Sequence, residues 1–109
     1  MDNENEKLIV SLFGLFSNLL KVLEDEGKGE VDFAIKEVKY LVGILNDCKL
    51  SNFSESVRII EEVKEINKSL YPPRGGLSEF FVWRKDFDER VKINNFLDNI
   101  KSKIWSSLA

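Results

Sequence analysis

Carboxylate side chains at helical spacing are the residues of this 109-residue sequence that most directly suggest chemistry. Glu61, Glu62 and Glu65 fall close together, and Asp86 and Glu89 follow further along the chain. Helical metal sites hold Mg²⁺ through carboxylates on facing helices that point into the space between them. A metal-dependent enzyme is therefore the first hypothesis that the pattern raises.

The helical angles of these glutamates argue against such a site. An all-α nucleotide pyrophosphohydrolase needs its glutamates on the inward side of the helix. Here Glu61 and Glu65 lie roughly 160° from the centre of the apolar face of their segment, and Glu62 roughly 100° from it. Asp86 and Glu89 have the spacing of a helix capping box instead. We expect the glutamates to face solvent and no metal to bind, and the pyrophosphohydrolase remains a second alternative.

Histidine is absent, and cysteine occurs once. Histidine is the usual acid–base group near neutral pH and the commonest transition-metal ligand in proteins. A single cysteine forms neither a disulfide framework nor a Cys/His zinc site. Because Cys48 has no histidine to activate it, we interpret it as a small packing residue and not as a nucleophile. These counts favour a function without catalysis and without a cofactor.

Two motifs with basic residues suggest ligand sites. Arg74 lies in the turn 72–76, which matches neither a P-loop nor a dinucleotide-binding motif. Its planar guanidinium group suits a carboxylate, either on a partner or within the chain. Basic and aromatic residues also mix around Trp83 and Trp105, as they do in nucleic-acid-binding proteins, but nearby acidic residues balance the bases. We expect no nucleic-acid partner.

The charges are unevenly distributed along the chain. The formal net charge is −3, from 16 basic and 19 acidic residues. Residues 1–62 contain thirteen acidic and seven basic side chains, whereas residues 63–109 contain six acidic and nine basic ones. The overall sign opposes nucleic-acid binding, which needs a cationic surface. The acidic half either suits a basic protein partner or is neutralised by the basic half within the fold.

Hydrophobic periodicity predicts an all-α fold in a single domain over residues 1–109. Apolar residues recur at helical spacing in four segments, at about 4–25, 30–47, 52–70 and 86–106. The first segment is apolar over roughly half of its circumference, which is typical of a helix in the middle of a bundle. We expect one bundle of about four main helices, with an ordered Pro-Gly loop before the last.

The helix boundaries and the loop give more specific expectations. Ser51 or Ser54 is expected to cap the third helix, and Asp86 the last. Residues 77–83 form either a short helical turn or an extended segment, because an apolar run this short does not distinguish the two. We also expect nine apolar residues of this region to be buried. They are Phe80, Phe81, Trp83, Phe87, Val91, Leu97, Ile100, Ile104 and Trp105.

The second helix carries more apolar residues than one buried face requires. Its main stripe is accompanied, almost on the opposite side, by Phe33, Tyr40 and Ile44, with Glu37 among them. A helix with two apolar sides is either packed between two neighbours or exposes an aromatic patch to a partner. In a bundle of this size, packing between neighbours is the favoured alternative.

Acidic residues gather where the first helix ends. Glu24, Asp25 and Glu26 precede the glycines, and Glu30 follows them. Carboxylates at a helix C-terminus oppose the helix dipole by a few tenths of a kcal/mol each, so the cluster suggests a binding role. The candidate partner-binding residues are Glu24, Asp25, Glu26, Glu30, Phe33, Tyr40, Ile44 and Arg74.

One long stretch resembles a signature of small bacterial proteins. The residues are Tyr71-Pro72-Pro73-Arg74-Gly75-Gly76-Leu77-Ser78-Glu79-Phe80-Phe81-Val82-Trp83-Arg84, followed by Asp86-Phe87-Asp88-Glu89-Arg90, and the likeness extends to Trp105. The setting of those proteins is similar to that of immunity proteins paired with polymorphic or contact-dependent toxins. The resemblance covers about a third of the chain, and it implies stoichiometric toxin binding without assigning any binding residue.

The sequence start gives no sign of export. It is acidic and polar, whereas a secretory signal begins with a basic region. The apolar stretch 8–23 is short and interrupted by polar residues, and neither terminus has a lipidation motif. We expect a cytoplasmic protein that does not bind membranes.

These observations converge on a non-enzymatic protein-binding function. The favoured hypothesis is a bacterial immunity protein that neutralises a cognate toxin, such as a basic nuclease, by stoichiometric binding. The first alternative is a helical adaptor or a homodimer that uses the same aromatic stripe. The exposure of Phe33 and Tyr40 in the folded chain bears on both, because anchors of an interface must be accessible.

Overall fold

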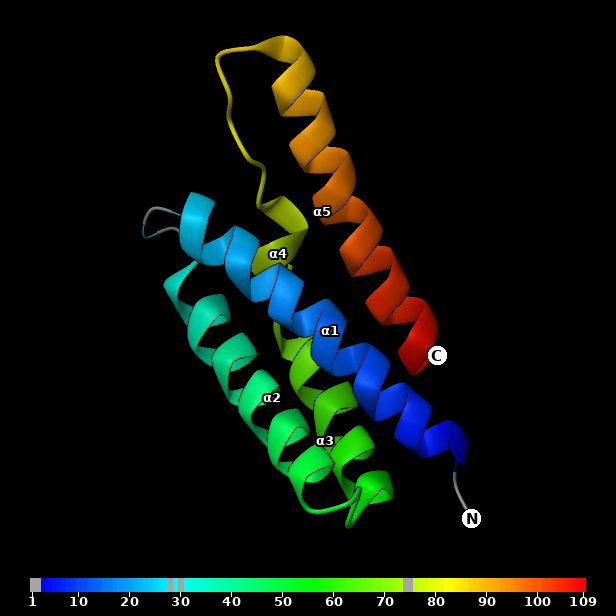
Figure 1. Ribbon diagram of the computed structural model, residues 1–109. Coiled ribbons are helices and arrows are strands. Elements are labelled where there is room, and N and C mark those ends of the chain that lie inside the picture. Colours follow the sequence, from blue (N-terminus) through cyan, green and yellow to red (C-terminus); the bar gives the residue numbers. More distant parts are fainter. Residues whose placement is uncertain (1–2, 28, 30, 74–75) are drawn as a thin grey trace.

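The chain folds into helices connected by short segments (Figure 1). The computed structural model describes residues 3–27, 29, 31–73 and 76–109, and these contain helices and no strand. The helices are α1 (Asn3–Glu26), α2 (Asp32–Leu50), α3 (Ser56–Ser69), the short α4 (Gly76–Glu79) and α5 (Phe87–Leu108). The predicted all-α class is confirmed. None of the helices in the described ranges has the length and apolarity to cross a bilayer.

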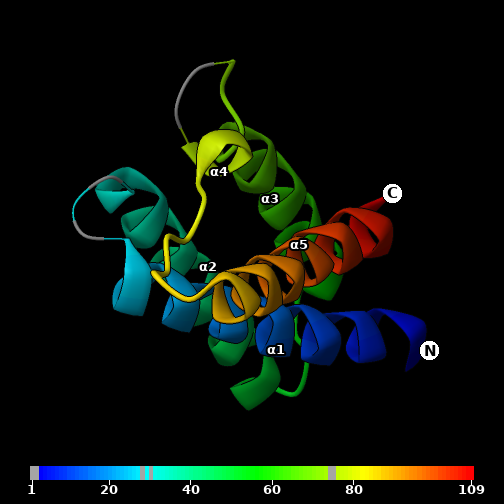
Figure 2. The same ribbon diagram turned by 90° about the horizontal axis from the view of Figure 1, so that it is seen from above.

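Helix α1 is central because its wide apolar stripe meets several neighbours. It packs against α2, α3 and α5, and Figure 2 shows α5 running alongside it. Its inward residues are fully buried, among them Ile9, Leu12, Phe16, Leu19 and Leu23. At about 25 cal/mol per Å² of apolar surface, each such side chain contributes roughly 2 kcal/mol to the hydrophobic stabilisation. The packing thus confirms the prediction that the first helix lies in the middle of the bundle.

Gly27 ends α1 as the sequence predicts. Its amide donates to the Leu23 carbonyl at 2.8 Å, which continues the helical hydrogen bonding by one residue. A Cβ atom at this position would lie 2.5 Å from both the Leu23 oxygen and a Val31 methyl group. A side chain is therefore excluded here, since the chain turns tightly towards α2.

The third helix begins later than predicted, and neither serine caps it. Glu55 is the N-cap residue, in the left-handed conformation at φ 56°, and its side chain makes no capping bond within the described chain. Asn52 and Phe53 also have positive φ. This compact turn is held by the Phe53 amide, which donates to the Cys48 carbonyl at 2.7 Å. Hydrogen bonds back to the end of α2 thus replace the serine cap.

The last helix has the predicted N-cap but a more exposed first half. Asp86 accepts a hydrogen bond from the Glu89 amide at 2.8 Å, which confirms the capping box. Phe87, Val91 and Trp105 are exposed by 64%, 40% and 40%, so their predicted burial is wrong. The first turns of α5 extend beyond the end of α1 (Figure 1), where no described helix covers them. Burial begins further along the helix, where Leu97 faces α1.

Candidate protein-binding site

The aromatic residues of the second stripe on α2 are exposed. Phe33 is 60% and Tyr40 47% accessible, whereas Ile44 is half-buried against the core. Helix α2 packs on α1, α3 and α4 through its other side, which contains Val38, Leu41 and Leu45. The favoured alternative, a helix packed between neighbours on both sides, is therefore wrong for the two aromatic residues. We name Phe33, Glu37, Tyr40 and Ile44 the α2 face.

Tyr40 is exposed and yet held in place. Its hydroxyl donates a hydrogen bond to the Glu62 carboxylate on α3. Arg58 on the same helix lies 3.7 Å from Glu62 and 3.0 Å from Glu55, so a chain of polar contacts connects the two helices. The hydrogen bond to Glu62 is the main cause that raises the pKa of Tyr40 above its ordinary value. A ring fixed before binding loses less conformational entropy when a partner covers it.

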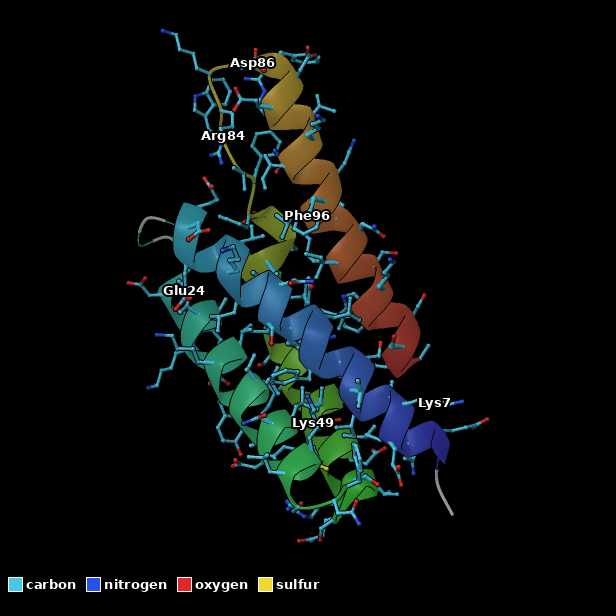
Figure 3. All side chains as sticks on the ribbon, in the orientation of Figure 1. Lys7, Glu24, Lys49, Arg84, Asp86 and Phe96 are labelled. Carbon is cyan, nitrogen blue, oxygen red and sulfur yellow. The ribbon has the colours of Figure 1, made fainter. Side chains whose placement is uncertain are left out.

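The acidic end of α1 divides between two sides of the molecule (Figure 3). Glu24 reaches α2, where it pairs with Lys39 at 3.4 Å. Glu26 turns towards the segment before α5 and binds both guanidinium nitrogens of Arg84, at 2.5 and 2.6 Å. Asp25 is exposed between them. Glu24 and Asp25 thus have outward-facing carboxylates, whereas Glu26 is engaged within the chain.

A groove separates the end of α1 from α5 on the side of Asp25. Its volume is about 320 Å³, and Asp25, Glu26, Ile93 and the half-exposed Phe96 are among its lining residues. In Figure 3, Phe96 lies between the two helices. The acidic end of α1 therefore borders apolar surface on this side as well.

Two of the predicted partner-binding residues have no structural description. Glu30 and Arg74 lie outside the described residues, so the structure places neither of them. Of the other six, three lie in the α2 face, Glu24 pairs with Lys39 on the same helix, Asp25 is exposed, and Glu26 pairs with Arg84. The structure thus brings the three residues of the α2 face together and separates Glu26 from them.

A hollow continues from the α2 face towards the turn before α3. It has a volume of about 330 Å³, and Ile44, Cys48 and Arg58 are among the residues that line it. The Cys48 thiol is buried and donates a weak hydrogen bond to the Ser54 carbonyl at 3.5 Å. Burial raises the pKa of this thiol, so it stays protonated at neutral pH and serves packing.

The glutamates of α3 lie mostly at the surface. Glu61 and Glu65 are exposed and pair with Lys64 and Lys68 at 3.4 and 3.3 Å. Glu62 is half-buried, because Tyr40 and Arg58 cover it, so the prediction that it faces solvent is only partly correct. Within the described ranges, no three acidic, cysteine or histidine side chains converge as metal ligands would.

A second aromatic surface was missed by the sequence analysis. Phe81 and Trp83 are 56% and 70% exposed, although both were predicted to be buried. Residues 76–79 form α4, and the chain then continues without regular structure to Asp86. Phe80 and Val82 are buried, so burial alternates with a period of two, whereas the sequence is apolar at all four positions 80–83 and gives no signal of this alternation. The Arg90 guanidinium lies 4.3 Å from the Trp83 ring centre and 5.3 Å from that of Phe87.

Comparisons of the chain with family models, curated proteins and solved structures found no match.

Proposed function

We propose that this chain is a cytoplasmic immunity protein of bacterial type, which neutralises a cognate toxin by binding it stoichiometrically without catalysis. It does so on a bundle of four main helices, with the α2 face as the contact surface. The observation that carries the proposal is the exposure of Phe33 and Tyr40 on one helix face. Aromatic side chains are enriched among the residues that contribute most to protein–protein binding.

The border of the α2 face favours a basic partner. Glu37 lies within the face, Glu62 of α3 binds Tyr40, and Glu24 pairs with Lys39 on the same helix. Complementary fields accelerate the encounter of two proteins and disfavour partners of the wrong charge. A toxin that binds nucleic acid has a basic surface. An acidic, aromatic face fits such a toxin better than it fits an acidic one, so a nuclease domain is the partner class we propose.

The proposal is tested by co-expression with the neighbouring toxin. We expect a gene for a large secreted protein immediately upstream, and its C-terminal domain should arrest growth when expressed alone. Co-expression of the present chain should restore growth, and the purified complex should contain the two proteins in equal amounts. A toxic domain that the wild-type chain neither binds nor neutralises overturns the proposal.

The two alternatives give different results in the same preparation. A tight homodimer that buries Phe33 and Tyr40, measured by size exclusion with light scattering, favours the adaptor or homodimer. Mg²⁺-dependent hydrolysis of nucleoside triphosphates that is abolished by Glu61→Gln favours the pyrophosphohydrolase. If the chain is an immunity protein, we expect no Mg²⁺-dependent hydrolysis, because Glu61 lies in a surface ion pair. We also expect no homodimer through the α2 face, because that face binds the toxin.

A further inference from the structure

The segment between α4 and α5 is extended, and side chains of α5 bind its backbone along one edge. The Asn94 side chain accepts from the Val82 amide at 2.9 Å and donates to the Val82 carbonyl at 2.8 Å. One amide group can bind both polar groups of a single residue only where they point the same way, as in a β-strand. The Arg84 carbonyl, two residues on, accepts from Arg90 at 3.3 Å. Helix α5 thus takes the place of a neighbouring strand on this edge.

The backbone N–H and C=O groups of Phe81 and Trp83 form the opposite edge of the extended segment. In an extended chain their backbone groups point away from those of Val82 and Arg84. No hydrogen bond joins the backbone groups of Phe81 or Trp83 to another residue of the described chain. Their side chains are also the exposed ones. An open strand edge with apolar side chains is a template for a further strand, and proteins normally cover or charge such an edge.

We propose that a second copy of this chain covers this edge, and that residues 80–85 of the two copies pair as antiparallel strands. The two-fold axis passes through Val82, so that Phe81 of each copy lies opposite Trp83 of the other. These two positions are the hydrogen-bonded pairs of the ladder, because their N–H and C=O groups face the partner. The contact is isologous, as two-fold dimers require.

The sequence of the segment is complementary to itself in this register. Aromatic side chains that lie directly opposite each other stabilise an antiparallel pair of strands. The Arg90 guanidinium already covers one side of Trp83, which fixes the ring in place.

The dimer leaves the α2 face free, so this inference is independent of the proposed function. The paired segment is at the end of the molecule where α5 extends beyond α1, and α2 lies elsewhere (Figures 1 and 2). A dimer would therefore present two α2 faces. Toxin neutralisation without dimerisation, or dimerisation without neutralisation, separates the two proposals.

Sedimentation velocity from micromolar to millimolar concentration tests the pairing. The wild-type mass should rise from 12.6 kDa towards twice that value. One variant carries Phe81→Lys with Trp83→Lys, and a second carries Phe81→Glu with Trp83→Glu. Each should stay monomeric because like charges face each other, and their mixture should again give dimers. Both sites are exposed, so unchanged circular dichroism and melting temperature serve as the folding control.

Each other outcome overturns the pairing. A wild-type chain that is monomeric at every concentration contradicts the proposed pairing. Charge variants that dimerise like the wild type contradict it as well. A mixture of the two charge variants that stays monomeric contradicts the antiparallel register. Loss of dimers in a control variant with Phe33→Lys and Tyr40→Lys assigns the contact to the α2 face. A monomeric wild type whose toxin binding is lost with Phe81→Lys and Trp83→Lys assigns the edge to the toxin.

Discussion

Arg84 and Glu26 form an ion pair with two parallel hydrogen bonds between residues 58 positions apart. The pair joins the extended segment before α5 to the end of α1. The hydrogen bonds that Arg84 donates to Glu26 raise the pKa of Arg84 further above its already high value, so the charge on the arginine is permanent. Bidentate geometry makes this contact specific to arginine, because lysine presents a single charged nitrogen.

Replacing Arg84 by lysine should therefore loosen the extended segment. We expect limited chymotrypsin cleavage after Phe81 and Trp83 to become several-fold faster, because cleavage follows the population of the open state. The matched control is Lys85→Ala, which removes an exposed neighbouring charge. Equal cleavage rates for Arg84→Lys and the wild type would show that the pair does not restrain the segment.

Asn94 should contribute more to stability than its neighbour Asn95. It binds both backbone groups of the buried Val82 and the Arg90 carbonyl, whereas Asn95 is exposed. Asn94→Leu leaves the Val82 groups unpaired, so the free energy of unfolding should fall by about 1–3 kcal/mol. Asn95→Leu should change it by less than about 0.5 kcal/mol. Urea unfolding measures both, and similar values for the two variants contradict the assigned role.

The buried Asn67 should be replaceable by leucine without loss of stability. It is 1% exposed, and neither polar atom of its side chain has a hydrogen-bond partner in the described chain. Burying an amide without a partner costs about 1–3 kcal/mol, and leucine has a similar size. We expect Asn67→Leu to raise the free energy of unfolding by about 1 kcal/mol, whereas Val63→Ala, in the same buried face, lowers it by about 2. A clear destabilisation by Asn67→Leu means that the amide has a partner.

Tyr71 should make the protein less stable in strong alkali. Burial raises the pKa of Tyr71 to about 12, and its ring packs on Trp105 with centres 5.2 Å apart. In the unfolded chain the hydroxyl titrates near its ordinary value of 10.0, so the unfolded state loses its proton first. The contribution of Tyr71 is therefore fully present below pH 10 and is lost as the pH rises towards 12, by about 2–3 kcal/mol.

The comparison of the wild type with Tyr71→Phe isolates this effect. All other titratable groups are the same in both proteins. The free energy of unfolding of the wild type should fall relative to that of Tyr71→Phe between pH 10 and pH 12, and the same comparison with Tyr40→Phe should show a smaller change because Tyr40 is exposed. A difference that stays constant across this range contradicts the buried hydroxyl.

Sequence periodicity predicted the long helices because burial of one face determines them. The apolar spacing of α1 and the capping box at Asp86 are local patterns, and the structure contains both. The start of α3 could not be predicted in this way. There, Phe53 is in a left-handed conformation that its residue type disfavours, and a hydrogen bond to Cys48 stabilises it. Such a turn depends on the end of the preceding helix and not on its own residues.

The exposed aromatic residues show a different limit of sequence analysis. Residue type predicted burial for Phe81, Trp83 and Phe87, and that prediction was wrong. Burial requires a neighbour, and the first turns of α5 extend past the helix that would supply one. For Phe33 and Tyr40 the sequence left both alternatives open, because a second apolar stripe says nothing about which other helices approach it. Only the packing of α2 decided between them.

The central claim is that the α2 face binds the toxin, and the affinity of two matched variants tests it most directly. The measurement is isothermal titration of the upstream-encoded toxin domain with Phe33→Ala/Tyr40→Ala and, as control, with Val10→Ala, whose side chain on α1 is as exposed as Tyr40. The account predicts a Kd at least about 30-fold weaker for the double variant, as for the loss of an interface anchor of about 2 kcal/mol, and an unchanged Kd for Val10→Ala. Wild-type affinity in the double variant contradicts the account.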